Sequence, residues 1–202
     1  SGSATYDIKD CVYDGTFNFT GKTSDQVGYG GLCQYPYAAG NIYTVTNFKN
    51  KSTANISGSC KSTIAGGLSQ YISATMIIDE NTEVSEKFNF NGTASKYLCY
   101  GGYWGNINHG VDTDSWKGTY SGTVTATGTL GSNLILAGIS AQHKSVVNID
   151  GVIYKGHIQA GTKEKGLTVN GDYIRIGGIL SGSSTDYDDD GFVHDIKNVK
   201  SY

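Results

Sequence analysis

The chain has 202 residues and a formal net charge of -3, with 29 Gly and 15 Tyr but a single Pro and a single Met. Charged residues make up 16% of the chain, against roughly 25% in an average soluble domain. The 15 basic residues are scattered among acids, which argues against a nucleic-acid-binding protein, and no apolar run is long enough for a membrane-spanning helix.

Alternation of apolar and polar residues predicts strands along most of the chain. We expect a single all-β domain over 1–202, with a subdivision into a disulfide-containing repeat region at 1–112 and a β-meander at 113–202 as the alternative. In chain order, the predicted strands are 6–9, 16–20, 41–48, 73–79, 83–90, 119–129, 133–139, 146–155 and 167–176.

Four Asx-Gly dipeptides interrupt these strands, at 14–15, 91–92, 150–151 and 170–171. Asn or Asp followed by Gly accepts the positive φ angles of a type I′ turn, which is the tightest connection between antiparallel strands. The sequence therefore predicts a mostly antiparallel β-sandwich or barrel built from Asx-Gly hairpins.

A parallel β-solenoid is the alternative fold. Similar Gly-containing segments at 137–140, 155–158 and 176–179 recur at spacings of 18 and 21 residues. Stacked turns of a solenoid produce repeats of about this length. In that fold, the Asx-Gly pairs would form corners instead of hairpins.

Two internal similarities accompany these patterns. Residues 17–31 and 88–102 agree at eight of fifteen positions at a constant offset of 71 residues, and both copies contain Phe-Asn-Phe and end in Tyr-Gly-Gly. They represent either two related binding loops or one structural unit used twice. The segment 6–10 also resembles 194–198, which predicts two terminal strands that pair with each other.

The four cysteines lie at wide spacings without a zinc-binding pattern, which predicts two disulfides in an oxidising compartment. Three connectivities are open, and four free thiols are the alternative. Loop-closure entropy favours neighbours along the chain. The preferred pairs are therefore Cys11–Cys33 and Cys60–Cys99.

Aromatic, Gly-rich segments around 97–116 and 29–37 are the candidate ligand site. Tyr and Trp offer flat amphipathic faces, and Asn and Asp can hydrogen-bond sugar hydroxyls. The predicted contacts are Tyr100, Tyr103, Trp104, Asn106, Asn108, His109, Asp112, Trp116, Tyr29 and Tyr35.

Two cofactors fit local patterns. A histidine in an aromatic, flexible loop, His109, can serve as an axial ligand of haem. The sequence at 186–191 matches the start of a calcium loop, where alternating carboxylates converge on one cation. The predicted calcium ligands are Asp186, Asp188, Asp190 and Asp195.

No motif for a nucleophile, a phosphate loop or a catalytic zinc is present, so we expect no catalysis. In composition, the chain is similar to bacterial surface adhesins, pilus-tip lectins and phage receptor-binding domains. We therefore expect a secreted or cell-surface, lectin-like module that binds a glycan or a host or partner surface protein. The alternatives are a secreted haem- or metal-acquisition protein and a structural shaft module.

Overall fold

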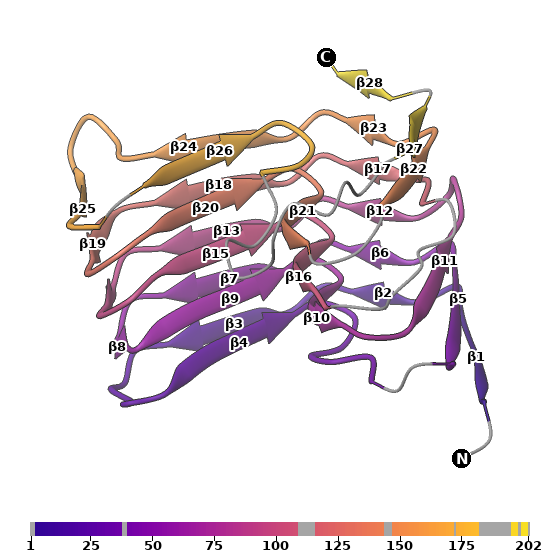
Figure 1. The fold of residues 1–202 in the computed structure, drawn as a ribbon, viewed down its shortest axis with the longest axis horizontal. Coiled ribbons are helices and arrows are strands. Elements are labelled where there is room, and N and C mark those ends of the chain that lie inside the picture. The colour runs from indigo at the N-terminus through magenta and orange to yellow at the C-terminus, as the bar shows by residue number, and fades with distance from the viewer. Residues whose placement is uncertain are drawn as a thin grey trace.

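The computed structural model describes residues 3–37, 40–108, 116–143, 147–171, 173–181, 195–197 and 199–201. Within these ranges, the regular secondary structure consists of strands, and the strands pair in parallel. The chain winds through successive turns that stack on one another as a parallel β-solenoid (Figure 1). The all-β prediction is confirmed.

Each turn contributes strands to the same set of sheets. Turn 1 comprises β1 (Thr5–Lys9), β2 (Val12–Tyr13), β3 (Thr16–Phe19) and β4 (Gln26–Gly30). Turn 2 comprises β5 (Ile42–Thr46), β6 (Lys49–Asn50), β7 (Thr53–Ile56), β8 (Ser59–Cys60), β9 (Ser62–Gly66) and β10 (Ser69–Ile72). Turn 3 comprises β11 (Thr75–Ile78), β12 (Glu83–Val84), β13 (Lys87–Phe90), β14 (Thr93–Ala94), β15 (Leu98–Gly101) and β16 (Trp104–Ile107).

The later turns repeat this order. Turn 4 comprises β17 (Thr119–Tyr120), β18 (Thr123–Ala126), β19 (Gly128–Leu130), β20 (Leu134–Ala137) and β21 (Ser140–His143). Turn 5 comprises β22 (Asn148–Asp150), β23 (Ile153–Tyr154), β24 (His157–Ala160), β25 (Leu167–Val169) and β26 (Ile174–Gly177). β27 (Asp195–Lys197) and β28 (Lys200–Ser201) begin a sixth turn.

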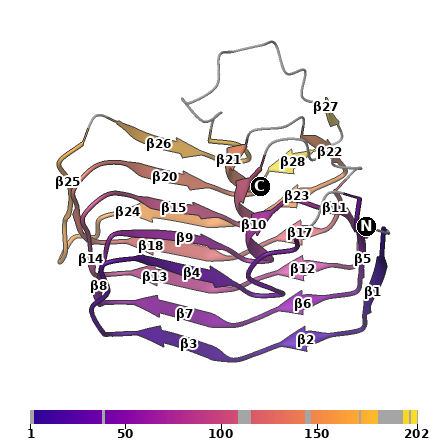
Figure 2. The same ribbon diagram turned by 60° about the horizontal axis from the view of Figure 1, so that its bottom comes forward.

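The principal walls are stacks of equivalent strands from successive turns (Figure 2). The largest have the orders β2-β6-β12-β17-β23-β28, β24-β18-β13-β7-β3 and β26-β20-β15-β9-β4. Residues at equivalent positions form columns along the axis. One interior column contains Phe17, Ala54, Phe88, Val124 and Ile158.

The prediction of antiparallel hairpins is wrong, and the solenoid alternative describes the fold. β22 and β23 flank the Asp150-Gly151 pair, yet they do not pair with each other. β22 pairs with β27, and β23 pairs with β17 and β28. Gly151 has a positive φ of 85° at a corner of the solenoid. Asp150 and the glycines of the other three Asx-Gly pairs do not lie in the left-handed region, so the backbone expected of type I′ turns is not formed.

The 71-residue repeat equals two turns. Phe17 and Phe88 lie in the same column, with Ala54 of the intervening turn between them. The middle residue of each Phe-Asn-Phe faces outward and joins a ladder. The amide of Asn55 donates to Oδ1 of Asn18 at 2.8 Å, and the amide of Asn89 donates to Oδ1 of Asn55 at 2.9 Å. The repeat is thus a structural unit of the wall.

The predicted pairing of the terminal strands is also wrong. β1 pairs with β5, and β27 pairs with β22 at the opposite end of the solenoid. The two similar segments instead occupy equivalent positions in different turns. Ile8 is the first residue and Ile196 the last of one column that runs through successive turns.

The predicted disulfides are not formed, because all four cysteines are free. Cys60 belongs to the main core inside the solenoid, whereas Cys99 packs outside the β15 wall with Ile64 and Ile135. The wall therefore separates these two thiols. Cys11 is exposed between β1 and β2, and Cys33 is half-buried after β4.

Two apolar clusters hold the structure together. The main cluster fills the interior, and the smaller cluster lies where β10, β16 and β21 pack against the outer face of the β9-β15-β20 wall. Gly105 makes this close approach feasible, since a Cβ there would lie 2.7 Å from Ile64 Cγ2. No described segment is a helix of the length and apolarity needed to span a membrane.

Candidate functional site

Most of the aromatic residues predicted to contact a ligand belong to the core. Four of them, Tyr100, Tyr103, Trp104 and Trp116, have side chains with no exposed surface. The rings of Trp104 and Trp116 lie 5.3 Å apart, and the Trp116 indole donates to the carbonyl of Met76 at 3.1 Å. These side chains stabilise the interior and are inaccessible to a ligand at the surface.

Tyr29 and Asn106 are also buried, at 5% and 7% exposure. The Asn106 amide donates to Oε1 of Gln142 in the next turn at 3.2 Å. Tyr29 takes part in an internal polar cluster, which we call the Glu86 cluster and define as Glu86, Tyr29, Tyr100, Asn50 and Ser52.

The Glu86 cluster surrounds a fully buried carboxyl group. The hydroxyl of Tyr29 donates to Glu86 Oε2 at 3.0 Å, and Asn50 Nδ2 donates to the same oxygen at 2.9 Å. The hydroxyl of Tyr100 donates to Oε1. Ser52 lies 2.6 Å from the Tyr29 hydroxyl and donates to Asn50 Oδ1 at 2.6 Å. Both carboxyl oxygens are thus hydrogen-bonded, as a buried carboxyl group requires.

Burial raises the pKa of Glu86 to about 7, although hydrogen bonds from Tyr100, Tyr29 and Asn50 act to lower it. Burial also raises the pKa of Tyr29 and of Tyr100, and the Glu86 charge adds to this effect. Because no part of Glu86 reaches solvent, this ionisable group acts on stability and not on a surface ligand.

Two predicted contacts, Tyr35 and Asn108, do come together at the surface, 73 positions apart in the sequence. Asn108 Nδ2 donates to the Tyr35 hydroxyl and to Ser73 Oγ, both at 2.8 Å. The Tyr35 ring lies 5.4 Å from Tyr37 and 5.5 Å from Tyr71, and Tyr35 is 43% exposed. We call these five residues the tyrosine cluster.

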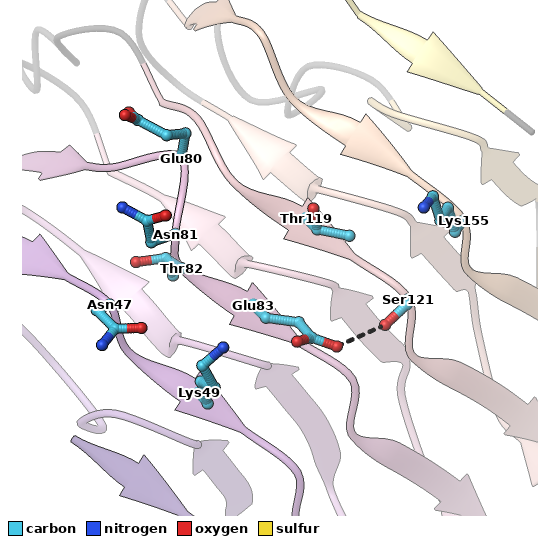
Figure 3. A pocket seen from close by; sticks show the side chains of 9 residues that line it. All are labelled: Asn47, Lys49, Glu80, Asn81, Thr82, Glu83, Thr119, Ser121 and Lys155. Carbon is cyan, nitrogen blue, oxygen red and sulfur yellow. Dashed lines mark hydrogen bonds between the residues drawn. The ribbon is translucent and has the colours of Figure 1, made fainter. Parts of the chain in front are cut away.

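A hollow of about 430 Å³ lies on another face, outside the β6-β12-β17-β23 wall (Figure 3). Its lining combines hydroxyl, amide, carboxylate and ammonium groups and contains no apolar side chain. The lining residues are Asn47, Lys49, Glu80, Asn81, Thr82, Glu83, Thr119, Ser121 and Lys155. We call this hollow the polar groove.

The register of the wall places five of the nine groove residues in two columns along the axis. Lys49, Glu83 and Thr119 occupy one column in three successive turns. Ser121 lies beside it, and its hydroxyl donates to Glu83 Oε1 at 3.4 Å. Lys155 of turn 5 follows at the far end (Figure 3). Parallel strands lie roughly 4.8 Å apart, so four turns give the groove a length of about 14 Å.

Asp79 fixes one end of the groove. Its Oδ1 accepts from the Thr82 hydroxyl at 2.7 Å and from the backbone amide of Asn47 at 3.0 Å, and its Oδ2 accepts from Asn81 at 3.1 Å. Partial burial acts to raise the pKa of Asp79, but these hydrogen bonds outweigh it and lower the pKa. Asn47 has a positive φ of 50°, which Asn tolerates better than most residues. The corner that carries Asn47 and Asn81 is therefore held by its own hydrogen bonds.

The groove was not identified from the sequence. Its residues come from four turns and share no local motif. The only signal was the recurrence of polar residues at outward positions at intervals of 34 and 36 residues, for example Lys49, Glu83 and Thr119. These intervals become visible only when the length of a turn is known.

The predicted cofactor residues fall mainly outside the described residues. His109, Asp112, Asp186, Asp188 and Asp190 all lie there, and Asp195 is in β27. Within the described part of the chain, no three His, Cys, Asp or Glu side chains are grouped closely enough to hold a metal ion. Calcium and haem remain sequence-based predictions.

Fold and site together define a parallel β-solenoid with a polar groove along one outer wall. The chain matches no protein-family model, and no curated protein or solved structure matches it either.

Proposed function

We propose that the protein is a non-catalytic module that binds an oligosaccharide along the polar groove. The observation that carries this proposal is the composition of the groove lining, which is entirely polar and comes from four successive turns. Its volume of about 430 Å³ is in the range of small-molecule sites. Its length suits an extended chain of sugar rings better than a single ring.

The donor and acceptor pattern favours a carbohydrate. Carboxylate and amide oxygens accept hydrogen bonds from sugar hydroxyls, while ammonium, amide and hydroxyl groups donate to sugar oxygens. A protein partner would be expected to contact aromatic and apolar anchors, which this lining does not contain. A nucleic acid would require an excess of basic groups, whereas Lys49 and Lys155 are balanced by Glu80 and Glu83.

A glycan array probed with the full chain tests this function. We expect hits on oligosaccharides, and we expect Glu83→Gln to weaken them at least tenfold, because the amide replaces one carboxylate acceptor with a donor. Glu164→Gln, an exposed position in the corner before β25, is the matched control. An array without hits, or hits that Glu83→Gln and Glu164→Gln leave equally strong, would overturn the proposal and favour a structural shaft module.

The tyrosine cluster is the second surface with features of a glycan site. Exposed rings stack on sugar rings, and Asn108 and Ser73 hold the Tyr35 ring in place before a ligand arrives. Tyr35→Ala measures its contribution on the same array. Tyr6→Ala is the control, because Tyr6 has nearly the same exposure, 44%, but stacks on Tyr43. Loss of binding in Tyr35→Ala alone would move the site from the groove to the tyrosine cluster.

We propose a secreted or cell-surface location from composition. The low charge and the abundance of Gly, Ser, Thr and Asn support it, whereas the cysteines, which are free, add nothing to it. Fractionation of the native source tests this location.

A further inference from the structure

The rings of the tyrosine cluster meet at steep angles. Tyr35 is the central ring, with Tyr37 at 5.4 Å and an interplanar angle of 65°, and Tyr71 at 5.5 Å and 54°. The exposed pair Tyr6 and Tyr43 is different, because its rings lie nearly parallel, 4.6 Å apart at 13°. Rings at steep angles do not cover each other's faces as a stacked pair does, so part of each face in the tyrosine cluster stays open.

These open faces are accessible to a ligand. Tyr37 is 67% exposed and Tyr35 is 43% exposed, while Tyr71 is half-buried. Within the described part of the chain, no lysine or arginine stacks on any of these three rings. The electron-rich ring faces are therefore open to a cation that comes from outside the chain.

Hydrogen bonds hold two of the rings in this arrangement. The Tyr35 hydroxyl accepts from Asn108 Nδ2 at 2.8 Å and lies 3.0 Å from Ser73 Oγ. The Tyr71 hydroxyl donates to Gln26 Oε1 at 3.2 Å. Because the rings are fixed before a ligand arrives, binding requires little further ordering of the protein.

The polar groups bonded to these rings are uncharged. They are the amides of Asn108 and Gln26 and the hydroxyl of Ser73, and none of them is a carboxylate. A lysine or arginine side chain carries N–H groups that need acceptors, and a primary ammonium is strongly hydrated. A quaternary ammonium has methyl groups in place of N–H groups, so it needs no acceptor and is attracted by the faces of aromatic rings.

The spacing of the rings suits such a group. A cation is attracted to an aromatic ring when it lies within about 6 Å of the ring centroid. The centroids of Tyr37 and Tyr71 lie 5.4 and 5.5 Å from that of Tyr35, so one cation can reach more than one ring. A rounded trimethylammonium group can contact rings that meet at steep angles, whereas a sugar ring stacks flat on one face at a time.

We propose that the tyrosine cluster binds a quaternary ammonium group, as in choline, against the faces of Tyr35, Tyr37 and Tyr71. The cluster and the polar groove lie on different faces of the solenoid. This second site therefore does not depend on the proposed binding of an oligosaccharide in the groove, and each site is tested by its own ligand.

Isothermal titration calorimetry of the full chain with choline chloride and with tetramethylammonium chloride tests this site. The matched probe is the tert-butyl analogue of choline, an uncharged alcohol of the same shape in which carbon replaces the ammonium nitrogen. We expect both cations to bind, and choline to bind about tenfold more tightly than its uncharged analogue, because only the cation is attracted by the ring faces. Equal affinity for the two would show apolar contact alone and would overturn the proposal.

Variants of the central ring locate the site. Tyr35→Leu keeps an apolar side chain but removes the ring, and we expect it to weaken choline binding about tenfold, whereas Tyr35→Phe keeps the ring face and should retain most of the affinity. Tyr37→Ala, at the most exposed of the three rings, is the second variant should Tyr35→Leu fail to fold. Tyr6→Leu is the control, because Tyr6 is 44% exposed but is stacked on Tyr43. Thermal unfolding followed by circular dichroism shows which variants are folded.

A choline group can be carried by a lipid or by a polysaccharide, and two further measurements separate these sources. Vesicles of phosphatidylcholine and a polysaccharide that bears phosphocholine are each compared with a choline-free counterpart. Capture that free choline blocks and that Tyr35→Leu abolishes identifies the source. Capture that free choline does not block would contradict the assignment.

Two further results would overturn this site. The first is an absence of binding to both choline and tetramethylammonium. The second is an equal loss of choline affinity in Tyr35→Leu and Tyr6→Leu. Neither result would affect the polar groove, which is tested separately by glycans without choline and by Glu83→Gln.

Discussion

Glu83 and Glu86 lie three residues apart in turn 3, on opposite sides of the same solenoid wall. Glu83 faces outward into the polar groove, and its carboxylate accepts from Ser121. Glu86 faces inward with no exposed surface, and its carboxyl group accepts from Tyr29, Tyr100 and Asn50. Identical side chains thus serve the surface in one case and the interior in the other. The side of the wall that a glutamate faces, and not the residue type, therefore determines whether it serves a surface site or the stability of the interior.

The largest expected effect follows from removing the inner carboxyl group. Glu86→Ala leaves Tyr29, Tyr100 and Asn50 without their shared acceptor and opens a cavity. We expect it to lower the free energy of unfolding by roughly 3–5 kcal/mol, since each buried unpaired group costs about 1–3 kcal/mol. Chemical denaturation measures this value. Glu83→Ala is the matched variant on the outer side. A similar loss of unfolding free energy in Glu83→Ala would contradict the different roles of Glu83 and Glu86.

The next effect is a dependence of stability on pH. Burial raises the pKa of Glu86 from its ordinary value of 4.5 to about 7. Between these values Glu86 keeps its proton in the folded chain, whereas the unfolded chain has released it. The contribution of Glu86 to the free energy of unfolding is therefore complete below about pH 4.5 and is lost as the pH rises to about 7. At 1.36 kcal/mol per pKa unit, the loss amounts to roughly 3 kcal/mol.

Glu86→Gln isolates this contribution, because glutamine has nearly the same shape and does not titrate. We expect the fall in the free energy of unfolding between pH 4.5 and 7 to shrink by about that amount in Glu86→Gln. Denaturation curves at several pH values measure it. An unchanged pH profile would show that the proton is held elsewhere.

A smaller effect concerns the outer face of another wall. Asn55 both donates to Asn18 and accepts from Asn89, and this ladder is solvent-accessible. Asn55→Ala is expected to lower the free energy of unfolding by about 1 kcal/mol. Thr125→Ala, at the same position in turn 4, is the control, with an expected change under about 0.5 kcal/mol. Equal losses would show that the ladder adds nothing specific to the wall.

Much of the local structure could be predicted from the sequence. Alternation identified strands, and the Asx-Gly pairs marked points of sharp direction change, as Gly151 shows. Which strands pair could not be predicted from the same pattern, because Asx-Gly pairs occur at corners of this solenoid as well as in hairpins. β22 and β23 differ from a hairpin only in having their partners in neighbouring turns.

The candidate site was predicted only in part, for a related reason. Glycine and tyrosine gather around 97–104, but there the glycines permit close packing of strands, and Tyr100 and Tyr103 fill the interior. Aromatic residues are as suited to a core as to a ligand surface, so density alone does not separate the two. Tyr35 and Asn108 reach the surface together because they lie at the ends of turns 1 and 3, with Ser73 of turn 2 bonded to both, which local sequence does not reveal.

The smallest expected change in stability belongs to Glu83→Gln, and comparing it with Glu86→Gln is the most direct test of the central claim. Both variants are measured for unfolding at pH 5 and pH 8 and for binding to the glycan array. We predict that Glu83→Gln changes the free energy of unfolding by less than about 0.5 kcal/mol and weakens glycan binding, while Glu86→Gln alters the pH dependence of stability and leaves binding intact. The opposite pattern, with binding lost in Glu86→Gln and retained in Glu83→Gln, would contradict the assignment of the outer groove to recognition and the inner carboxyl group to stability.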